Sequence, residues 1–158
     1  MILGCVFTFM KPEYIFTTIT IVIGFFVAYT AYNQYRLSKE KFKLDMFDKR
    51  YGVYKNTQVF LTKILRDAKI EMEDIFEFRA GTQDSVFLFK EDIPNYLKNI
   101  DNKALDFWKI HKSLDGVPKG EELSKMCRKQ TELLGWLTGE LPELKNKFEP
   151  YLKFKTWK

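Results

Sequence analysis

Residues 41–54 read KFKLDMFDKRYGVY, in which Phe, Leu, Met and Tyr are interleaved with Lys, Asp and Arg. Mostly apolar residues recur here and downstream at steps of three and four, which is the spacing of one face of a helix. This first row consists of Leu44, Phe47, Tyr51, Tyr54, Gln58, Leu61, Leu65 and Ala68. A second row beside it consists of Phe42, Met46, Val53, Phe60 and Ile64. The stretch predicts a long helix whose apolar face is wide enough to contact two other helices, with most of its charges on the solvated side.

Arg50 lies between these two apolar rows. A guanidinium group in that position either extends to water or pairs with a carboxylate. Its predicted partner is Asp92, at the start of a later helix, with Glu91 and Asp84 as the alternatives. We interpret Arg50 as a residue that fixes packing; the functional alternative is a contact with a ligand or a partner protein.

The same helical spacing recurs twice downstream. The first of these rows consists of Ile93, Leu97, Ile100, Ala104, Phe107, His111 and Leu114. The second consists of Leu123, Cys127, Gln130, Leu134, Leu137, Leu141, Leu144, Phe148 and Tyr151. The second row continues through Gly135, Gly139 and Pro142 without a change of phase, which predicts one long helix, kinked or briefly broken near Pro142. Residues 115–120, DGVPKG, have the composition of a turn, so the two helices are expected to be antiparallel.

A shorter element lies between the first and second long helices. Residues 71–80, EMEDIFEFRA, fit a short helix whose acids, Asp74 included, are expected on a solvated face near its electropositive N-terminus. Residues 81–85 interrupt it, and residues 86–89, VFLF, could form a strand, a turn or the lead-in to a helix. The predicted fold class is therefore all-α. An N-terminal transmembrane helix continues into an antiparallel bundle of three long helices and one short helix over residues 36–152.

The stretch at residues 15–32, IFTTITIVIGFFVAYTAY, contains no charged side chain. As a helix it would be about 27 Å long, close to the thickness of the hydrocarbon core of a bilayer. Tyrosines flank it, as in the aromatic belts of membrane helices; they are Tyr14, Tyr29, Tyr32 and Tyr35. We predict an uncleaved transmembrane helix over residues 14–35. A buried helix of a soluble protein and a cleaved signal peptide are the alternatives.

Basic residues are distributed unequally around this helix. Lys11 precedes it, and the residues that follow it closely are Arg36, Lys39, Lys41, Lys43, Lys49 and Arg50. The positive-inside rule therefore predicts an N-terminus outside the cell membrane and a cytoplasmic C-terminal domain, with the lipid bilayer as a partner. Residues 1–13 are a short apolar segment in which Met10 is an alternative translation start. Lipidation of Cys5 is not expected, because the residues before it are too few to form a lipoprotein leader.

The sequence has few residues suited to catalysis. It contains no glycine-rich phosphate loop, paired metal-ligand motif or nucleophile elbow. His111 and Cys127 fall on helix rows, where we expect a core histidine with a satisfied ring and a buried thiol. The formal net charge of +5 is weak evidence for nucleic-acid binding. The prediction is a protein that is not an enzyme, with no cofactor, no metal site and no specific nucleic-acid partner.

Two further features indicate association. Within the apolar stretch, Thr20, Gly24 and Ala28 form a row of small residues of the kind that lets membrane helices approach closely, which predicts a homo-oligomer. The basic and aromatic tail, residues 153–158 (KFKTWK), suits a membrane interface or an acidic partner. Packing of this tail on the bundle is the alternative.

Three segments together resemble a group of small bacterial proteins that have one N-terminal transmembrane helix and a cytoplasmic helical domain. They are residues 44–51 (LDMFDKRY, with Tyr54 following), residues 87–97 (FLFKEDIPNYL) and residues 134–152, which end in ELKNKFEPYL. The resemblance extends from residue 35 to residue 152 and implies a location in the bacterial inner membrane. It implies no activity and no catalytic residues.

The sequence therefore predicts a membrane-tethered interaction module, an adaptor or scaffold that binds itself or an unknown protein partner at the cytoplasmic face of the membrane. The alternative is a membrane-active effector of a stress or phage-defence system. In that alternative, the transmembrane helix self-associates and disturbs the bilayer, and the small residues of the apolar stretch favour it.

Overall fold

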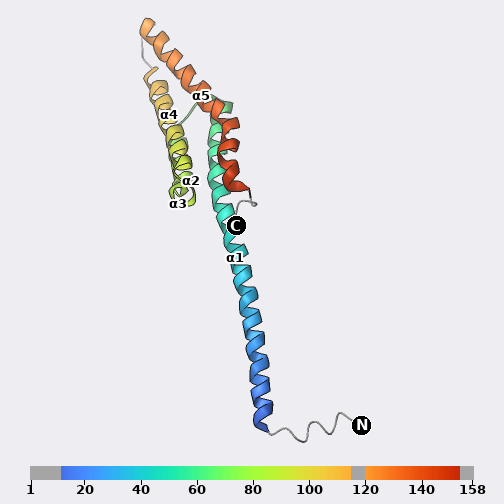
Figure 1. Cartoon of the computed structure of the whole chain (residues 1–158). Coiled ribbons are helices and arrows are strands. Elements are labelled where there is room, and N and C mark those ends of the chain that lie inside the picture. The colour runs from blue at the N-terminus through green and yellow to red at the C-terminus, as the bar shows by residue number, and fades with distance from the viewer. Residues whose placement is uncertain (1–11, 115–119, 154–158) are drawn as a thin grey trace. The chain divides into compact units, whose positions relative to one another are not determined.

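The computed structural model describes residues 12–114 and 120–153, with side chains from Tyr14 onward (Figure 1). Every element within these residues is a helix. The helices are α1 (Pro12–Asp67), α2 (Met72–Thr82), α3 (Ser85–Leu88), α4 (Asp92–Leu114) and α5 (Glu121–Leu152). The predicted all-α fold is confirmed: α1, α4 and α5 are the three long helices, and α2 is the short one. Residues 86–89, for which the sequence allowed a strand, a turn or the lead-in to a helix, contribute to α3, which is a single helical turn.

The chain divides into two compact units, Met1–Leu44 and Asp45–Lys158, and α1 contributes to both. In the first unit, the described residues form the beginning of α1, and their large apolar side chains are mostly exposed. This part of α1 includes a stretch that is long and apolar enough to cross a membrane and that is not buried against other parts of the protein. It is the one candidate membrane-spanning helix in the part of the chain that the structure describes.

All five helices contribute side chains to the core of the second unit. The buried residues of α1 are Val53, Thr57, Phe60, Leu61 and Ile64. Phe60 stacks on Phe78 of α2, with ring centroids 4.5 Å apart. Tyr54 meets the edge of Phe148 of α5 at 5.6 Å. Helix α1 therefore packs against both α2 and α5 through aromatic rings.

The buried face of α1 is rotated from the expected one. Its centre lies between the two predicted rows, where Thr57 is fully buried and its hydroxyl donates to the Val53 carbonyl oxygen (2.9 Å). Tyr51 and Leu65, which belong to the first predicted row, are 45% and 53% exposed. The prediction that the two rows face the core is therefore wrong for Tyr51 and Leu65, and also for Leu44 of the first row (51% exposed) and Phe42 of the second (65% exposed). Helical spacing identifies an apolar face but does not show how much of it the neighbouring helices cover.

Helices α4 and α5 are antiparallel, as predicted. The Tyr96 hydroxyl donates to the Glu140 carbonyl oxygen at 3.5 Å, and farther along α4, His111 Nδ1 lies 3.0 Å from Gln130 Nε2. His111 is half-buried rather than part of the core, and its ring has a hydrogen-bond partner, as predicted. The predicted turn between the two helices, residues 115–120, lies almost wholly outside the described residues.

Helix α5 continues through Pro142, which confirms the prediction of one long helix. Its axis changes direction part-way along (Figure 1). Pro142 has no N–H to donate to the Thr138 carbonyl oxygen, so one bond of the helical ladder is missing there. The Thr138 hydroxyl donates back to the Leu134 carbonyl oxygen (2.9 Å), a contact that often accompanies bending in helices.

Two polar side chains are placed differently from the prediction. Cys127 is exposed rather than buried. The buried residues of α5 begin at Leu133, so Cys127 lies on a part of the helix that is incompletely covered. Asp74 is buried rather than solvated, and its carboxylate accepts hydrogen bonds from Lys63 Nζ and from the Glu71 N–H (3.0 Å for the latter). These bonds satisfy the carboxylate in the first turn of α2, where the helix dipole also favours an anion.

Candidate functional site around Arg50

Arg50 joins parts of the second unit that are far apart in the sequence. Its Nε donates a hydrogen bond to the Leu88 carbonyl oxygen at the end of α3 (2.9 Å). Its guanidinium carbon lies 5.8 Å from the ring centroid of Phe89, which follows α3, and 5.8 Å from that of Tyr151, near the end of α5. Both distances are within the range of cation–π attraction. One guanidinium group therefore connects α1, α3 and α5.

The carbonyl that Arg50 contacts is available because α3 is so short. The last carbonyl groups of a helix have no partner within the helix. In α3, the Phe89 N–H donates to the Ser85 carbonyl oxygen (3.0 Å) and closes the single turn, which leaves the Leu88 carbonyl oxygen to accept another bond. A guanidinium is a suitable donor for it, because the group is always charged and its N–H bonds have a fixed direction.

Aromatic rings pack beside the guanidinium. Phe89 meets Phe148 and Tyr151 edge-on, with ring centroids 5.3 Å and 5.2 Å apart. Phe148 is fully buried and also contacts Tyr54 of α1. Edge-to-face pairs of this kind contribute about 0.5–1.5 kcal/mol each beyond the burial of their area. Together these contacts hold the residue after α3 against α5, and through Phe148 they connect it to α1.

Asp92 is connected to Arg50 through Tyr151. The Tyr151 hydroxyl donates to Asp92 Oδ1 (2.7 Å), while the Tyr151 ring lies near the guanidinium. The Tyr151 side chain thus links the two residues, and the direct ion pair between Arg50 and Asp92 stays a prediction. Asp84, one of the two alternative partners, is the N-cap residue of α3, and its carbonyl oxygen accepts a bond from the Phe87 N–H (3.0 Å). Glu91, the second alternative, directly precedes α4, and its carbonyl oxygen accepts a bond from the Asn95 N–H (3.0 Å). The residues of this connection, called the Arg50 clamp from here on, are Arg50, Leu88, Phe89, Asp92 and Tyr151.

The electrostatics of the clamp favour a charged arginine and a neutral tyrosine. Burial lowers the pKa of the Arg50 guanidinium from its ordinary value, and the charge of a deprotonated Tyr151 would act in the opposite direction. The guanidinium stays charged at neutral pH, because the ordinary pKa of an arginine lies far above neutrality. Burial first, and then the hydrogen bond to Asp92, raise the pKa of the Tyr151 hydroxyl. The phenol therefore keeps its proton at neutral pH and remains a donor to Asp92.

The contacts described for the clamp are packing contacts between helices. The partners described for the guanidinium are a backbone carbonyl and two aromatic rings, and none of these groups is a nucleophile or a general base. Within residues 12–114 and 120–153, no group of three or more His, Cys, Asp or Glu side chains could hold a metal ion. The arrangement connects α1, α3 and α5.

The residues predicted to mediate self-association lie on the surface of α1 in the first unit. Thr20, Gly24 and Ala28 are exposed. Thr20 Oγ1 donates to the Phe16 carbonyl oxygen (2.9 Å), so its hydroxyl is satisfied within the helix. A Cβ atom added at Gly24 would meet nothing within 4 Å. One copy of the chain leaves this row uncovered, and association between copies stays a prediction.

Comparison of the chain with protein-family models, with curated proteins and with solved structures gave no match. The three segments from which the sequence analysis predicted a resemblance to small bacterial membrane proteins all contribute to the clamp. They supply Arg50 (residues 44–51), Leu88, Phe89 and Asp92 (residues 87–97) and Tyr151 (residues 134–152). Segments that are separate in the sequence therefore meet at one place in the fold.

The sequence identified Arg50 and Asp92 but missed Phe89 and Tyr151 as members of the clamp. Both aromatic residues were visible, Phe89 in the VFLF segment and Tyr151 at the end of the last helical row. Helical spacing does not show which rings from separate segments meet, because it carries no information about contacts over long sequence distances.

We expect Arg50→Ala to lower the free energy of unfolding by about 2–4 kcal/mol. A hydrogen bond that involves a charged group contributes about 1.5–3 kcal/mol, and a cation–π contact about 0.5–1 kcal/mol. Arg50→Lys should lower the free energy of unfolding by an intermediate amount. An ammonium group keeps the charge but cannot present a planar fork of N–H groups to the carbonyl and the two rings. Urea unfolding of the full chain in detergent micelles, followed by near-ultraviolet circular dichroism, measures both losses.

Lys55→Ala is the matched control, because Lys55 is an exposed cation on the same helix. Substitutions at such positions change stability by roughly 0.5 kcal/mol or less. Equal stability of the wild type and Arg50→Ala would show that Arg50 does not hold the bundle together. Arg50 would then become a candidate for direct contact with a partner.

Proposed function

We propose that this protein is a membrane-tethered helical interaction module, an adaptor or scaffold at the cytoplasmic face of a bacterial inner membrane. The observation that supports the proposal is that two parts of α1 have different surroundings. One part of this helix is apolar, unburied and long enough to cross a bilayer. The part in the second unit packs one face into the core and leaves apolar side chains of another face exposed. An anchor and an uncovered surface are the two parts that such a module needs.

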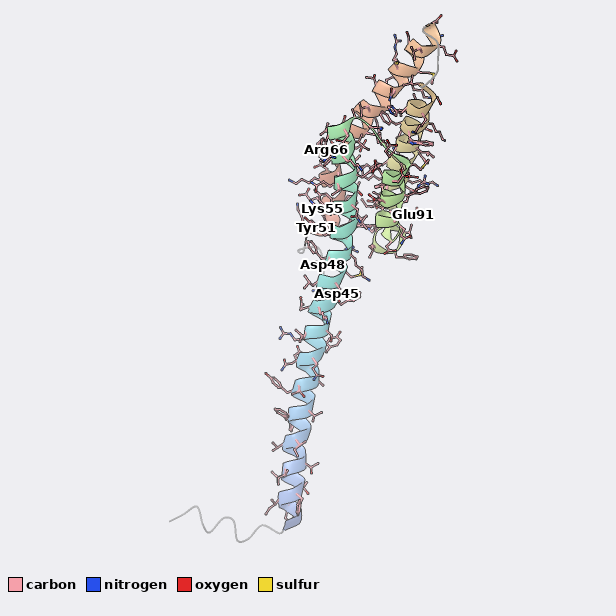
Figure 2. The ribbon with its side chains drawn as sticks, turned by 180° about the vertical axis from the view of Figure 1, so that it is seen from behind. Asp45, Asp48, Tyr51, Lys55, Arg66 and Glu91 are labelled. Atoms are coloured by element: carbon pink, nitrogen blue, oxygen red, sulfur yellow. The ribbon has the colours of Figure 1, made fainter. Side chains whose placement is uncertain are left out.

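The exposed face of α1 in the second unit mixes apolar and charged side chains. Its apolar members are Tyr51, Val59 and Leu65, which are 45%, 56% and 53% exposed. Asp48, Lys55 and Arg66 lie on the same side of the helix by their spacing, and Figure 2 labels them together with Tyr51. These six residues are called the outer α1 face from here on. Aromatic and aliphatic anchors beside charged groups are typical of protein interfaces.

A photoreactive residue on the outer α1 face should capture a partner protein in cells. We expect benzoylphenylalanine in place of Tyr51 to yield a discrete crosslinked product after irradiation. Leu65→Glu in the same chain should reduce that product, because it places a charge in the interface without disturbing the core. Immunoblots of the full chain measure the products.

Phe76 provides the control position for this crosslinking, because it is 59% exposed but lies on α2. Benzoylphenylalanine there should give little product. Equal yields from positions 51 and 76, or no product from position 51, would contradict the interaction module.

The proposed orientation places the C-terminal domain in the cytoplasm. The bias of basic residues toward the C-terminal side of the candidate span supports it. We expect a green fluorescent protein fused after Lys158 to fluoresce and an alkaline phosphatase fused at the same position to be inactive. The opposite pattern would overturn the localisation.

A second candidate function is a membrane-active effector of a stress or phage-defence system. The observation that favours it is the exposed row of small residues on the candidate membrane-spanning part of α1. In such an effector, copies of the chain associate through Thr20, Gly24 and Ala28 and disturb the bilayer. Close approach of two helix backbones at small residues is a common mode of association in membranes.

Gly24→Ile should weaken association between copies of the candidate span, because a branched side chain keeps the two backbones apart. Energy transfer between donor-labelled and acceptor-labelled full chains in lipid vesicles measures association. Val22→Ile, on the opposite side of the helix by its spacing, is the control and should leave the transfer unchanged. If the wild type and Gly24→Ile gave the same transfer, the effector would lose its support.

A further inference from the structure

A groove open to solvent runs along α4 on the side that carries α2 and α3. It consists of two adjoining hollows, the first of about 480 Å³ and the second of about 460 Å³, which share Val86, Pro94 and Asn95 as lining residues. Figure 2 labels Glu91, which directly precedes α4 and lines the beginning of the first hollow. Asp101 lines the second hollow farther along the helix. The groove therefore follows one face of α4 from Glu91 to Asp101.

Apolar side chains line both hollows. In the first, Val86 is 59% exposed, and Phe89 and Pro94 are half-buried. In the second, the buried side chains of Phe78 and Leu97 form part of the wall. Covering apolar surface of this kind with another apolar group is favourable in water.

The described part of α5 ends beside the first hollow. The Tyr151 ring meets Phe89 with centroids 5.2 Å apart, and its hydroxyl donates to Asp92 Oδ1 at the start of α4 (2.7 Å). Two residues later, Lys153 leaves the helix in an extended conformation, with φ −82° and ψ 115°. Residues 154–158, FKTWK, follow Lys153 and lie outside the described residues. This segment, called the tail from here on, therefore begins within a few residues of the groove.

The length of the tail matches the length of the groove. An extended chain of five residues spans at most about 16–18 Å, and α4 rises about 15 Å between Glu91 and Asp101. The spacing of the two aromatic residues of the tail also suits two adjoining hollows. In an extended chain with three residues per turn, Phe154 and Trp157 fall on the same side, about 9 Å apart.

We propose that the tail folds back along α4 and occupies this groove, with the Phe154 ring in the first hollow and the Trp157 ring in the second. The two lysines of the tail then lie on the side that faces water, where their charges stay hydrated. The tail covers apolar surface next to the Arg50 clamp and is not bound to the bilayer or to another protein. This inference does not depend on the proposed function, because it concerns a contact within one chain.

Disulfide formation between two engineered cysteines tests the proposal in the full chain, with Cys5 and Cys127 replaced by serine. The pair is Asn95→Cys and Thr156→Cys, because Asn95 lines both hollows and Thr156 lies between the two aromatic residues of the tail. A tether alone brings the two thiols together at times. The rate is therefore compared with that of the same chain carrying Phe154→Ala and Trp157→Ala, in nanodiscs of phosphatidylcholine. We expect the chain with both aromatic rings to form the intramolecular disulfide about tenfold faster, because the rings hold the tail in the groove.

Lys109→Cys paired with Thr156→Cys is the matched control, because Lys109 is exposed on α4 like Asn95 but lies about 21 Å farther along the helix. This pair should give little intramolecular product. Both α4 positions are exposed, so these substitutions should keep the fold.

Three results would overturn the proposal. Equal rates with and without the two aromatic rings would mean that the thiols meet only through the tether. A product that joins two chains rather than two parts of one chain would assign the groove to a second copy. A rate that falls to that of the double alanine variant when phosphatidylglycerol is added to the nanodiscs would assign the tail to the anionic bilayer surface.

Discussion

The hydrogen bond from Arg50 to the Leu88 carbonyl oxygen is the contact on which this end of the second unit depends. The segment between α2 and α4 is too short to form a core of its own, since α3 is one turn with Ser85 and Leu88 as its buried side chains. The position of this segment is set by its contacts with the guanidinium group of Arg50 and with the aromatic rings beside that group. The start of α4 and the end of α5 are held at the same place, because the Tyr151 hydroxyl donates a hydrogen bond to Asp92.

Polar contacts of this kind recur at the edges of the apolar core. Lys63 of α1 binds the buried carboxylate of Asp74 at the start of α2. Arg79 of α2 binds both carboxylate oxygens of Asp101 on α4, at 2.7 Å and 2.9 Å. Apolar burial supplies most of the driving force for folding but does not depend on direction, whereas these bonds do. The core therefore brings the helices together, and the polar contacts at its margin fix how each one lies.

How much of the structure could be predicted from the sequence depends on the distance along the chain over which each sequence pattern carries information. Apolar spacing is a local property, so it identified the long helices and α2, but four residues were too few to identify α3. Arg50 was recognisable because a charge within an apolar face is visible locally. The exposure of Leu65, the burial of Asp74 and the contact with Tyr151 depend on which helices pack together. No pattern within one helix contains that information, which is why these features appeared only in the structure.

The Arg50 clamp also has a consequence for biosynthesis, because it cannot close until Tyr151 has been made. About one hundred residues separate Tyr151 from Arg50. At a synthesis rate of about 5–20 residues per second, Tyr151 is therefore added to the chain roughly 5–20 s after Arg50. The candidate membrane-spanning part of α1 leaves the ribosome well before the bundle can fold. During that interval Tyr54 has no Phe148 to pack against. The fold thus separates in time the emergence of the candidate membrane-spanning part from the closure of the clamp.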